Sequence, residues 1–281
     1  MMSFLAQLAT LINVVTNALG RFLLAPIGVL PGWLSNGIVS AVTGVVLLII
    51  LKYTSNQTAV GRVRDNIKAN MLTLKLFKDS MVVTFKAQGH LFKGAFMLLF
   101  HYIRPMLISI IPVSLLAAQM ALWYQSRPLL QGEEAVVTMQ LNNNVEKPWP
   151  EINVESMPSA EVITGPVRVL SKREVYWKIK ARQNGLHRMV FEVRDDLVEK
   201  ELAIGEGFMC VSAERPGWRW ADILLHPAEK PLGPDSVVQS ISIDYPDRLS
   251  WTSGTDWWLV YFFVASLVFA LISKPFLRVR L

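Results

Sequence analysis

The stretch LKYTSNQTAVGRVRDNIKANMLTLKLFKDSMVVTFKAQGHLFKGAFMLLFHYIRP, residues 51 to 105, decides the fold of this chain. It carries nine Lys or Arg residues and two acids, and it lies between two apolar runs of 19 residues, Trp33 to Leu51 and Pro105 to Trp123. Short loops rich in Lys and Arg are retained on the cytoplasmic side of a membrane. The sequence therefore predicts a basic cytoplasmic segment held between two membrane spans.

The composition supports a membrane protein. Of the 281 residues, 52% are hydrophobic and only 18% are charged, which is too apolar for an ordinary soluble domain. A third window, Trp257 to Ser273, also lacks ionisable side chains. At about 1.5 Å per residue, each of the three windows approaches the roughly 30 Å of a hydrocarbon core. We therefore expect three transmembrane helices.

The distribution of charge orients these spans. Residues 124 to 256 hold 20 of the 22 carboxylates, whereas Lys274, Arg278 and Arg280 make the tail basic. Aromatic residues mark the expected outer ends of the spans: Trp33, Trp123, Tyr124, Trp251, Trp257 and Trp258. The chain is therefore predicted to be N-out and C-in. The single cysteine, Cys210, excludes an internal disulfide and is expected to be an inert thiol in an apolar strand.

The first 30 residues are predicted to form an interfacial amphipathic helix. They lack the basic n-region and small-residue cleavage site of a removable signal peptide. Apolar residues recur at helical spacing, and polar residues occupy other faces. The apolar set is Phe4, Leu5, Leu8, Leu11, Ile12, Val15 and Leu19, and the polar set is Gln7, Thr10, Asn13, Thr16 and Asn17.

The basic segment has a helical period and is either one helix or a helical hairpin, with Asp79 and Ser80 as candidate caps and Gly89 as a candidate break. Its charge has three interpretations: a lipid-facing surface, a docking site for an acidic partner or ribosomal RNA, and part of a polar cavity. Met is suited to varied apolar partners, but core packing is the favoured reading for Met71, Met81, Met97 and Met106. The candidate contacts for client, ribosome or lipid are Arg62, Arg64, Lys68, Met71, Lys75, Lys78, Met81, Lys86 and Lys93.

From Glu134 onward the hydrophobic period changes from about 3.6 to 2, which predicts strands. In EVYWKIKARQ, residues 174 to 183, apolar side chains alternate with polar ones, and Asn184-Gly185 predicts a two-residue hairpin to a strand at 186 to 196. Other expected strands cover 134 to 141, 151 to 156, 160 to 164, 197 to 203, 207 to 213 and 236 to 244, with a long loop at 214 to 234. Seven to nine short strands favour an immunoglobulin-like β-sandwich.

The sequence offers no recognisable catalytic arrangement. His90, His101, His187 and His226 are scattered, no metal or nucleophile motif is present, and neither an enzyme nor a cofactor is expected. Polar residues within the spans are costly unless paired, so they face other helices or a wet cavity. Such residues at or within the spans include Arg104, Ser109, Ser114, Gln119 and Ser40; a groove among the spans and hydroxyl-mediated helix packing both explain them, and Arg104 also fits a snorkelling side chain.

The order of these segments resembles the YidC/Oxa membrane-protein insertase superfamily. KANMLTLKLFKDS at 68 to 80 and RPMLISIIPVSLLAAQMALWY at 104 to 124 are similar to its three-span branch, which includes archaeal insertase-like proteins and the insertase-type subunit of the endoplasmic-reticulum membrane protein complex. The resemblance covers residues 33 to 124 and 257 to 281. It implies a nucleotide-independent insertase whose groove, lined by the five residues above, admits hydrophobic client segments. The β domain departs from the minimal three-span core.

The sequence thus predicts an interfacial helix (1–30), a first span (31–52), basic cytoplasmic helices (53–104), a second span (105–124), an extracytoplasmic β-sandwich (125–250), a third span (251–273) and a basic tail (274–281). The expected location is the bacterial inner membrane. Expected partners are membrane lipids, nascent membrane proteins, the ribosome and an envelope protein, with no DNA. The rival function is a non-catalytic anchor or assembly scaffold whose β-sandwich binds the envelope partner.

Overall fold

The computed structural model of the chain describes residues 2–24, 30–77, 80–142, 149–194, 196–248, 257–277 and 279. They form two compact units. The first unit contains residues 1–36 and 115–260, and the second contains residues 37–114 and 261–281. The β region lies in the first unit, and the basic segment lies in the second.

Four helices within the described ranges are long and apolar enough to cross a membrane. They are α1 (Met2–Leu24), α2 (Gly32–Thr54), α4 (Met81–Tyr124) and α6 (Trp257–Leu277). Three of them contain the predicted spans. The fourth, α1, is the helix that the sequence predicts at the interface.

The basic segment is a pair of helices, which settles the choice between one helix and a hairpin. Helix α3 (Gln57–Leu76) begins at Asn56, whose side chain accepts a hydrogen bond from the Ala59 N–H at 3.0 Å. Helix α4 then starts at Met81 and continues through Gly89, Pro105 and Pro112. Hence the predicted break at Gly89 is wrong, and Pro105 lies inside a helix rather than at its start. We call α3 together with residues 81–104 of α4 the helical hairpin.

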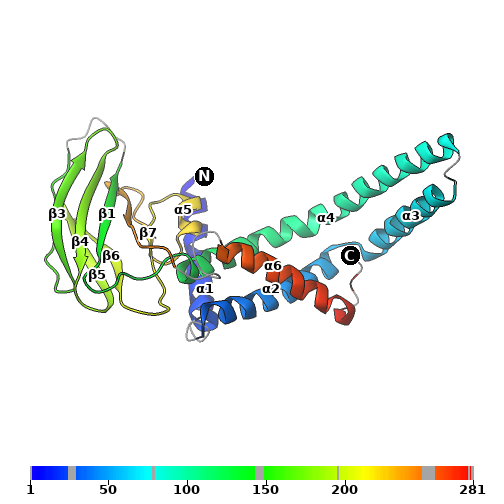
Figure 1. Cartoon of the computed structure of the whole chain (residues 1–281). Coiled ribbons are helices and arrows are strands. Elements are labelled where there is room, and N and C mark those ends of the chain that lie inside the picture. The colour runs from blue at the N-terminus through cyan, green and yellow to red at the C-terminus, as the bar shows by residue number, and fades with distance from the viewer. Residues whose placement is uncertain are drawn as a thin grey trace. The chain divides into compact units, whose positions relative to one another are not determined.

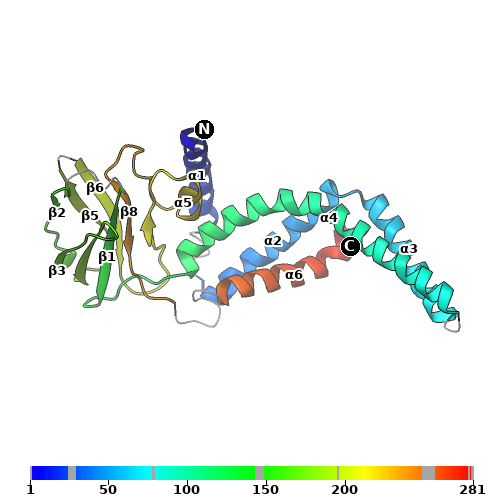
Figure 2. The same cartoon turned by 90° about the horizontal axis from the view of Figure 1, so that it is seen from above.

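In the second unit α2 and α6 cross in Figure 1 and lie next to each other in Figure 2. A Cβ atom added to Gly44 would lie 2.3 Å from the backbone oxygen of Ser266 and 3.1 Å from the nitrogen of Ala270. Helices in lipid pack closely where small residues let their backbones approach. The backbones of α2 and α6 therefore approach closely at Gly44.

We expect Gly44→Ala to destabilise the protein by about 1–3 kcal/mol, because the new methyl group overlaps the Ser266 backbone. Thermal unfolding in detergent measures the effect. Gly89→Ala is the matched control: nothing lies within 4 Å of the added Cβ, and Ala is a better helix former, so stability should rise by up to about 1 kcal/mol. Equal effects of the two substitutions would contradict close packing at Gly44.

The β region forms two antiparallel sheets, as the change of period predicted. The five-stranded sheet has the order β3-β4-β1-β8-β7, and the three-stranded sheet has the order β2-β5-β6 (Figures 1 and 2). The strands are β1 (Glu134–Leu141), β2 (Ile152–Val154), β3 (Ala160–Val169), β4 (Glu174–Ala181), β5 (Gly185–Val193), β6 (Asp196–Ile204), β7 (Glu214–Arg215) and β8 (Val238–Ile243).

Both sheets contribute to one hydrophobic core. Val175, Trp177, Ile179 and Ala181 of β4 are all buried, which confirms the alternation predicted for this strand. Trp177 meets Phe191 of β5 with ring centroids 5.2 Å apart, so the largest core side chain contacts the other sheet.

The predicted hairpin at Asn184-Gly185 is wrong. Strand β4 pairs with β1 and β3, whereas β5 pairs with β2 and β6, so the chain changes sheets at this point. Gly185 has φ +139°, but Asn184 is not among the residues with positive φ, and a type I′ turn needs both. The backbone N–H groups of Arg182 and Gln183 instead donate to the oxygen of Ser159.

Two other predictions for this region are also corrected. Residues 207–213 form no strand, and Cys210 there is half-buried. The stretch instead meets α4, because the Val211 N–H donates to the Leu122 oxygen at 2.8 Å. The predicted loop at 214–234 contains β7 and a short helix, α5 (Trp220–Leu225).

Candidate functional site

The turn of the helical hairpin exposes an unusual amount of apolar surface. The side chains share large size and high exposure, with Met81 76% and Val82 78% exposed. We call this set the hairpin tip; its members are Met71, Leu72, Leu76, Phe77, Met81, Val82 and Phe85. Soluble surfaces rarely carry a contiguous patch of this kind unless it binds a partner or a membrane.

Burial along α3 explains why these side chains are exposed. Val60 and Val63 near its start are buried, Ile67 is half-buried, and the apolar residues from Met71 to Phe77 are mostly exposed. A hairpin of two helices is one layer thick and covers only the faces that meet, as at Ile67 and Gly94, where an added Cβ would approach the Ile67 side chain to 2.7 Å. Core packing was the wrong expectation for Met71, Met81, Met97 and Met106, which are all exposed.

The predicted basic contacts surround these apolar residues along the hairpin. Arg62, Lys68, Lys75, Lys86 and Lys93 are exposed, and Arg64 is half-buried. Lys78 lies outside the described residues. The hairpin therefore presents large apolar side chains and exposed cations on the same two helices.

The predicted groove residues do not share one surface of α4. Arg104 and Ser114 are exposed, Ser109 is half-buried, and its hydroxyl donates to the Pro105 oxygen of the same helix at 2.8 Å. Each step of five residues turns a helix by about 140° beyond a full turn, so residues 104, 109, 114 and 119 point in different directions. Ser40 on α2 is fully buried.

Gln119 has a specific partner that the sequence did not indicate. Its Nε2 donates to Oδ1 of Asn17 on α1 at 2.6 Å. Gly20 on α1 lies against the same side chain, since an added Cβ would be 2.7 Å from the Gln119 Oε1. Gln119 thus joins α4 to α1 and is 7% exposed.

Helix α2 turns its polar side chains inward. Ser35, Asn36, Ser40 and Thr43 are buried. Ser35 shares a 2.6 Å hydrogen bond with the Tyr124 hydroxyl, and Asn36 donates to the Trp258 oxygen at 3.2 Å. The apolar residues of the same helix face outward: Ile38, Val42, Val46 and Ile49. This arrangement satisfies polar groups among helices, as expected for helices that face lipid.

The expected aromatic belt divides into two groups. Trp33 and Trp257 are exposed, whereas Tyr124 and Trp258 are buried and stack with centroids 6.1 Å apart. Trp251 lies outside the described residues. Tyr124 and Trp258 therefore pack inside the protein instead of facing headgroups.

The β region is fastened to the end of α4 by Arg248. Its guanidinium lies 4.6 Å from the Phe208 ring centroid and donates to the oxygens of Trp123 at 2.7 Å and Met209 at 3.1 Å. Phe208 in turn stacks on Trp123 with centroids 5.7 Å apart. These contacts use the stretch that was expected to be a strand, which is why no strand forms there.

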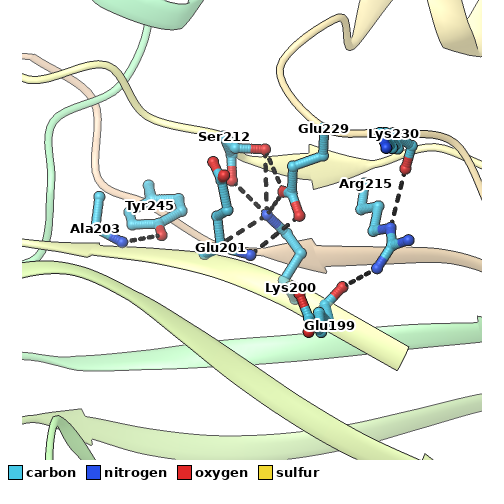
Figure 3. Close-up of polar contacts among 9 residues, drawn as sticks. All are labelled: Glu199, Lys200, Glu201, Ala203, Ser212, Arg215, Glu229, Lys230 and Tyr245. Carbon is cyan, nitrogen blue, oxygen red and sulfur yellow. Dashed lines mark hydrogen bonds and ion pairs between the residues drawn. The ribbon is translucent and has the colours of Figure 1, made fainter. Parts of the chain in front are cut away.

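A buried charged cluster fixes the segment after β7 to strand β6 (Figure 3). The Lys200 Nζ lies 2.5 Å from the Glu229 Oε1 and 2.7 Å from the Ser212 backbone oxygen, and the Lys200 side chain is fully buried. Glu229 also accepts from the Ser212 hydroxyl at 2.5 Å and from the Glu201 N–H at 3.0 Å. Burial lowers the pKa of Lys200, and the Glu229 carboxylate opposes that shift.

A serine beside a lysine is also the arrangement of some nucleophilic enzymes. Here the Lys200 Nζ donates to Glu229 and to the Ser212 backbone oxygen, and it lies 3.3 Å from the Ser212 hydroxyl. Lys200 has no exposed surface, and Ser212 is only 5% exposed. A substrate has no access to either side chain, so the cluster supports the structure of the β region.

The segment that carries Glu229 also contacts α1. The Asn13 Nδ2 donates to the Ile223 oxygen at 2.5 Å, and the Asn17 Nδ2 donates to the Pro227 oxygen at 2.6 Å. Ala6 and Ala9 pack on the buried side chain of Ile223. Residues 223–229 therefore contact α1 through backbone oxygens and β6 through the Glu229 carboxylate.

Apolar helices of membrane-spanning length together with an antiparallel β region define the general class of this protein, a membrane protein with a β domain. Comparisons with protein-family models, curated proteins and solved structures returned no match. Among the residues that the structure describes, no group of three or more His, Cys, Asp or Glu side chains is placed to hold a metal ion.

Proposed function

We propose that the protein is a membrane-protein insertase or membrane chaperone of the three-span type. In this proposal the chain is N-out and C-in in a bacterial inner membrane, the helical hairpin is cytoplasmic, and the β region is an immunoglobulin-like sandwich outside. The observation that carries the proposal is the hairpin tip, because its large apolar side chains are exposed. A segment with no binding task would not keep such a surface in water.

The chemistry of the tip suits hydrophobic client segments. Met and Phe side chains at the tip offer adaptable apolar surface, since the Met side chain is flexible and polarisable. The exposed basic side chains of the hairpin would attract anionic headgroups or the phosphates of a ribosome. Membrane lipids, nascent membrane proteins and the ribosome are thus the partners of the proposed cytoplasmic side, and no nucleotide is hydrolysed.

The span residues supply the second part of the proposal. Each unsatisfied backbone group in a client's polar flank costs several kcal/mol of free energy in hydrocarbon. Polar side chains along the path lower that cost. Arg104 and Ser114 are exposed and Ser109 is half-buried, and in this proposal each contacts a client from its own side of α4. Gln119 and Ser40 are buried and act in helix packing instead.

A different function, an anchor or assembly scaffold, is favoured by another observation. Helices α2 and α6 meet closely at Gly44, which leaves no room for a client between them. In this alternative the spans only hold the β region, which binds an envelope partner. The two functions differ in what contacts the helical hairpin.

Site-specific photocrosslinking separates the two functions. A photoreactive amino acid at position 81 or 85 of the tip, or at 104 or 109, is presented to ribosome-bound nascent membrane proteins, with position 268 in α6 as the control. For an insertase we expect crosslinks from the tip and then from 104 or 109, and only when the client carries a hydrophobic segment. Crosslinks to stable membrane neighbours alone would instead establish the scaffold.

A further inference from the structure

The polar and apolar faces of helix α1 are reversed relative to those of a helix on a water-exposed surface. The side chains that point into the protein include two asparagines, Asn13 and Asn17, while large apolar side chains point outward. The outward residues recur every three or four positions on one face: Phe4, Leu8, Leu11, Val15 and Leu19, with Phe4 67% and Leu11 64% exposed. A helix in water shows the opposite arrangement, so its outer face is matched to an apolar medium.

Two contacts join α1 to the last turns of α4, within the first unit. The Asn17–Gln119 hydrogen bond and the Gly20–Gln119 contact place its second half against α4, one turn from Trp123. Helix α1 lies across the last turns of α4 rather than alongside them (Figures 1 and 2). The apolar face is therefore held near the membrane–water boundary at the end of a candidate span.

The opposite face of α1 packs on a charged segment, which argues against α1 as a transmembrane helix. It packs against α5, and the segment around α5 is charged: the Arg219 side chain is 82% exposed and pairs with Asp222 at 3.4 Å. Were α1 to cross the bilayer, α5 and these charges would enter hydrocarbon, which costs several kcal/mol per charge. Water on the α5 side and lipid on the other side are satisfied together only at the membrane surface.

We propose that α1 lies in the plane of the membrane, with Phe4, Leu8, Leu11, Val15 and Leu19 inserted among the lipids on the side of the β region. The ligand is the boundary between headgroups and acyl chains, where amphipathic helices insert by about 5–10 Å. Because residues 223–229 join α1 to the charged cluster on β6, the inserted helix also fixes the β region on the membrane surface. This inference does not depend on the insertase proposal.

Depth-dependent fluorescence quenching tests the proposal. A Cys210→Ser background receives a single cysteine in place of Leu11 or Val15, which is labelled with an environment-sensitive dye. The full chain is then reconstituted in vesicles of phosphatidylcholine and phosphatidylglycerol that contain a shallow or a deep lipid quencher. Leu170→Cys, on the exposed turn after β3, is the aqueous control, and Val264→Cys in α6 is the control within the bilayer.

We expect the dye at 11 and 15 to be quenched at least about twofold more strongly by the shallow quencher than by the deep one, as for an in-plane helix. Stronger quenching by the deep quencher would make α1 a fourth span and overturn the proposal. A signal that matches Leu170→Cys, or disulfide-linked dimers through position 11, would also overturn it, because water or a second copy would then cover this face.

Discussion

Replacement of Lys200 by methionine is expected to lower the free energy of unfolding of the β region by about 3–5 kcal/mol. The substitution keeps the length of the side chain but leaves the Glu229 carboxylate, 7% exposed, without its cation. The carboxylate keeps its hydrogen bonds from the Ser212 hydroxyl and the Glu201 N–H, but these do not replace both its hydration and its counterion. Chemical denaturation of the full chain in detergent, followed by near-ultraviolet circular dichroism, measures the loss.

Two controls separate the buried charge from other effects. Lys200→Met combined with Glu229→Gln removes both charges; the Gln oxygen accepts from the Glu201 N–H and the Gln NH2 donates to the Ser212 hydroxyl oxygen, so it should recover most of the lost stability. Arg188→Met breaks the exposed pair with Glu199 and should change stability by less than about 1 kcal/mol. A double variant as unstable as Lys200→Met would show that packing, not charge, accounts for the loss.

The same pair connects the β region to α1. Glu229 follows Pro227 by two residues, and the Pro227 oxygen accepts the hydrogen bond from Asn17. Asn17 in turn accepts from Gln119 on α4. Loss of the Lys200–Glu229 pair therefore weakens the attachment of α1 as well as the β region, through contacts that continue from β6 to a candidate span.

The parts of the fold that the sequence predicted are those with a local period. Alternation in β4 identified its buried face, because each side chain of a strand faces opposite to the next. Uninterrupted apolar runs likewise identified α2, the second half of α4 and α6. Both signals need only neighbouring residues, so neither depends on how the chain folds back on itself.

Pairing between distant segments could not be predicted in this way. Asn184-Gly185 has the composition of a tight turn, yet β4 pairs with β3 before it and with β1, from Gln140–Glu174 (174 − 140 = 34 residues apart) to Glu134–Lys180 (180 − 134 = 46 residues apart). Lys200 and Glu229 are similarly 29 residues apart, with β7 and α5 between them. Tertiary packing determined these pairings, and the turn-forming composition of Asn184-Gly185 did not prevent them.

The candidate functional site was also predicted only in part. The positions of the basic residues and of Met71 and Met81 were identified, but their exposure was not, because periodicity does not reveal how many layers will cover a stripe. For Asn13 and Asn17 the sequence indicated a polar face but not its partners. Polar residues on one face of an amphipathic helix indicate water, whereas here they donate to backbone oxygens of a distant segment.

Substitution of Met81 and Phe85 together by serine is expected to reduce client insertion by at least about tenfold. Burial of one Met or Phe side chain contributes about 1.5–3 kcal/mol, and 1.4 kcal/mol corresponds to a tenfold change in binding. Both side chains are exposed, at 76% and 70%, so their removal leaves no cavity and should not change the unfolding temperature. Protease protection of a client in vesicles that contain the purified protein measures insertion.

Leu170→Ser is the matched control, because Leu170 is 73% exposed and belongs to the β region. Insertion at the normal level in this variant, together with the loss in the tip variant, would locate client binding on the helical hairpin.

Lys68→Gln with Lys75→Gln removes two exposed charges from α3 and keeps its apolar surface. A loss in this charge variant that falls as ionic strength rises would assign the initial attraction to anionic groups. If both serines leave insertion unchanged, the exposed tip has no role in insertion, and the anchor becomes the better account of the spans.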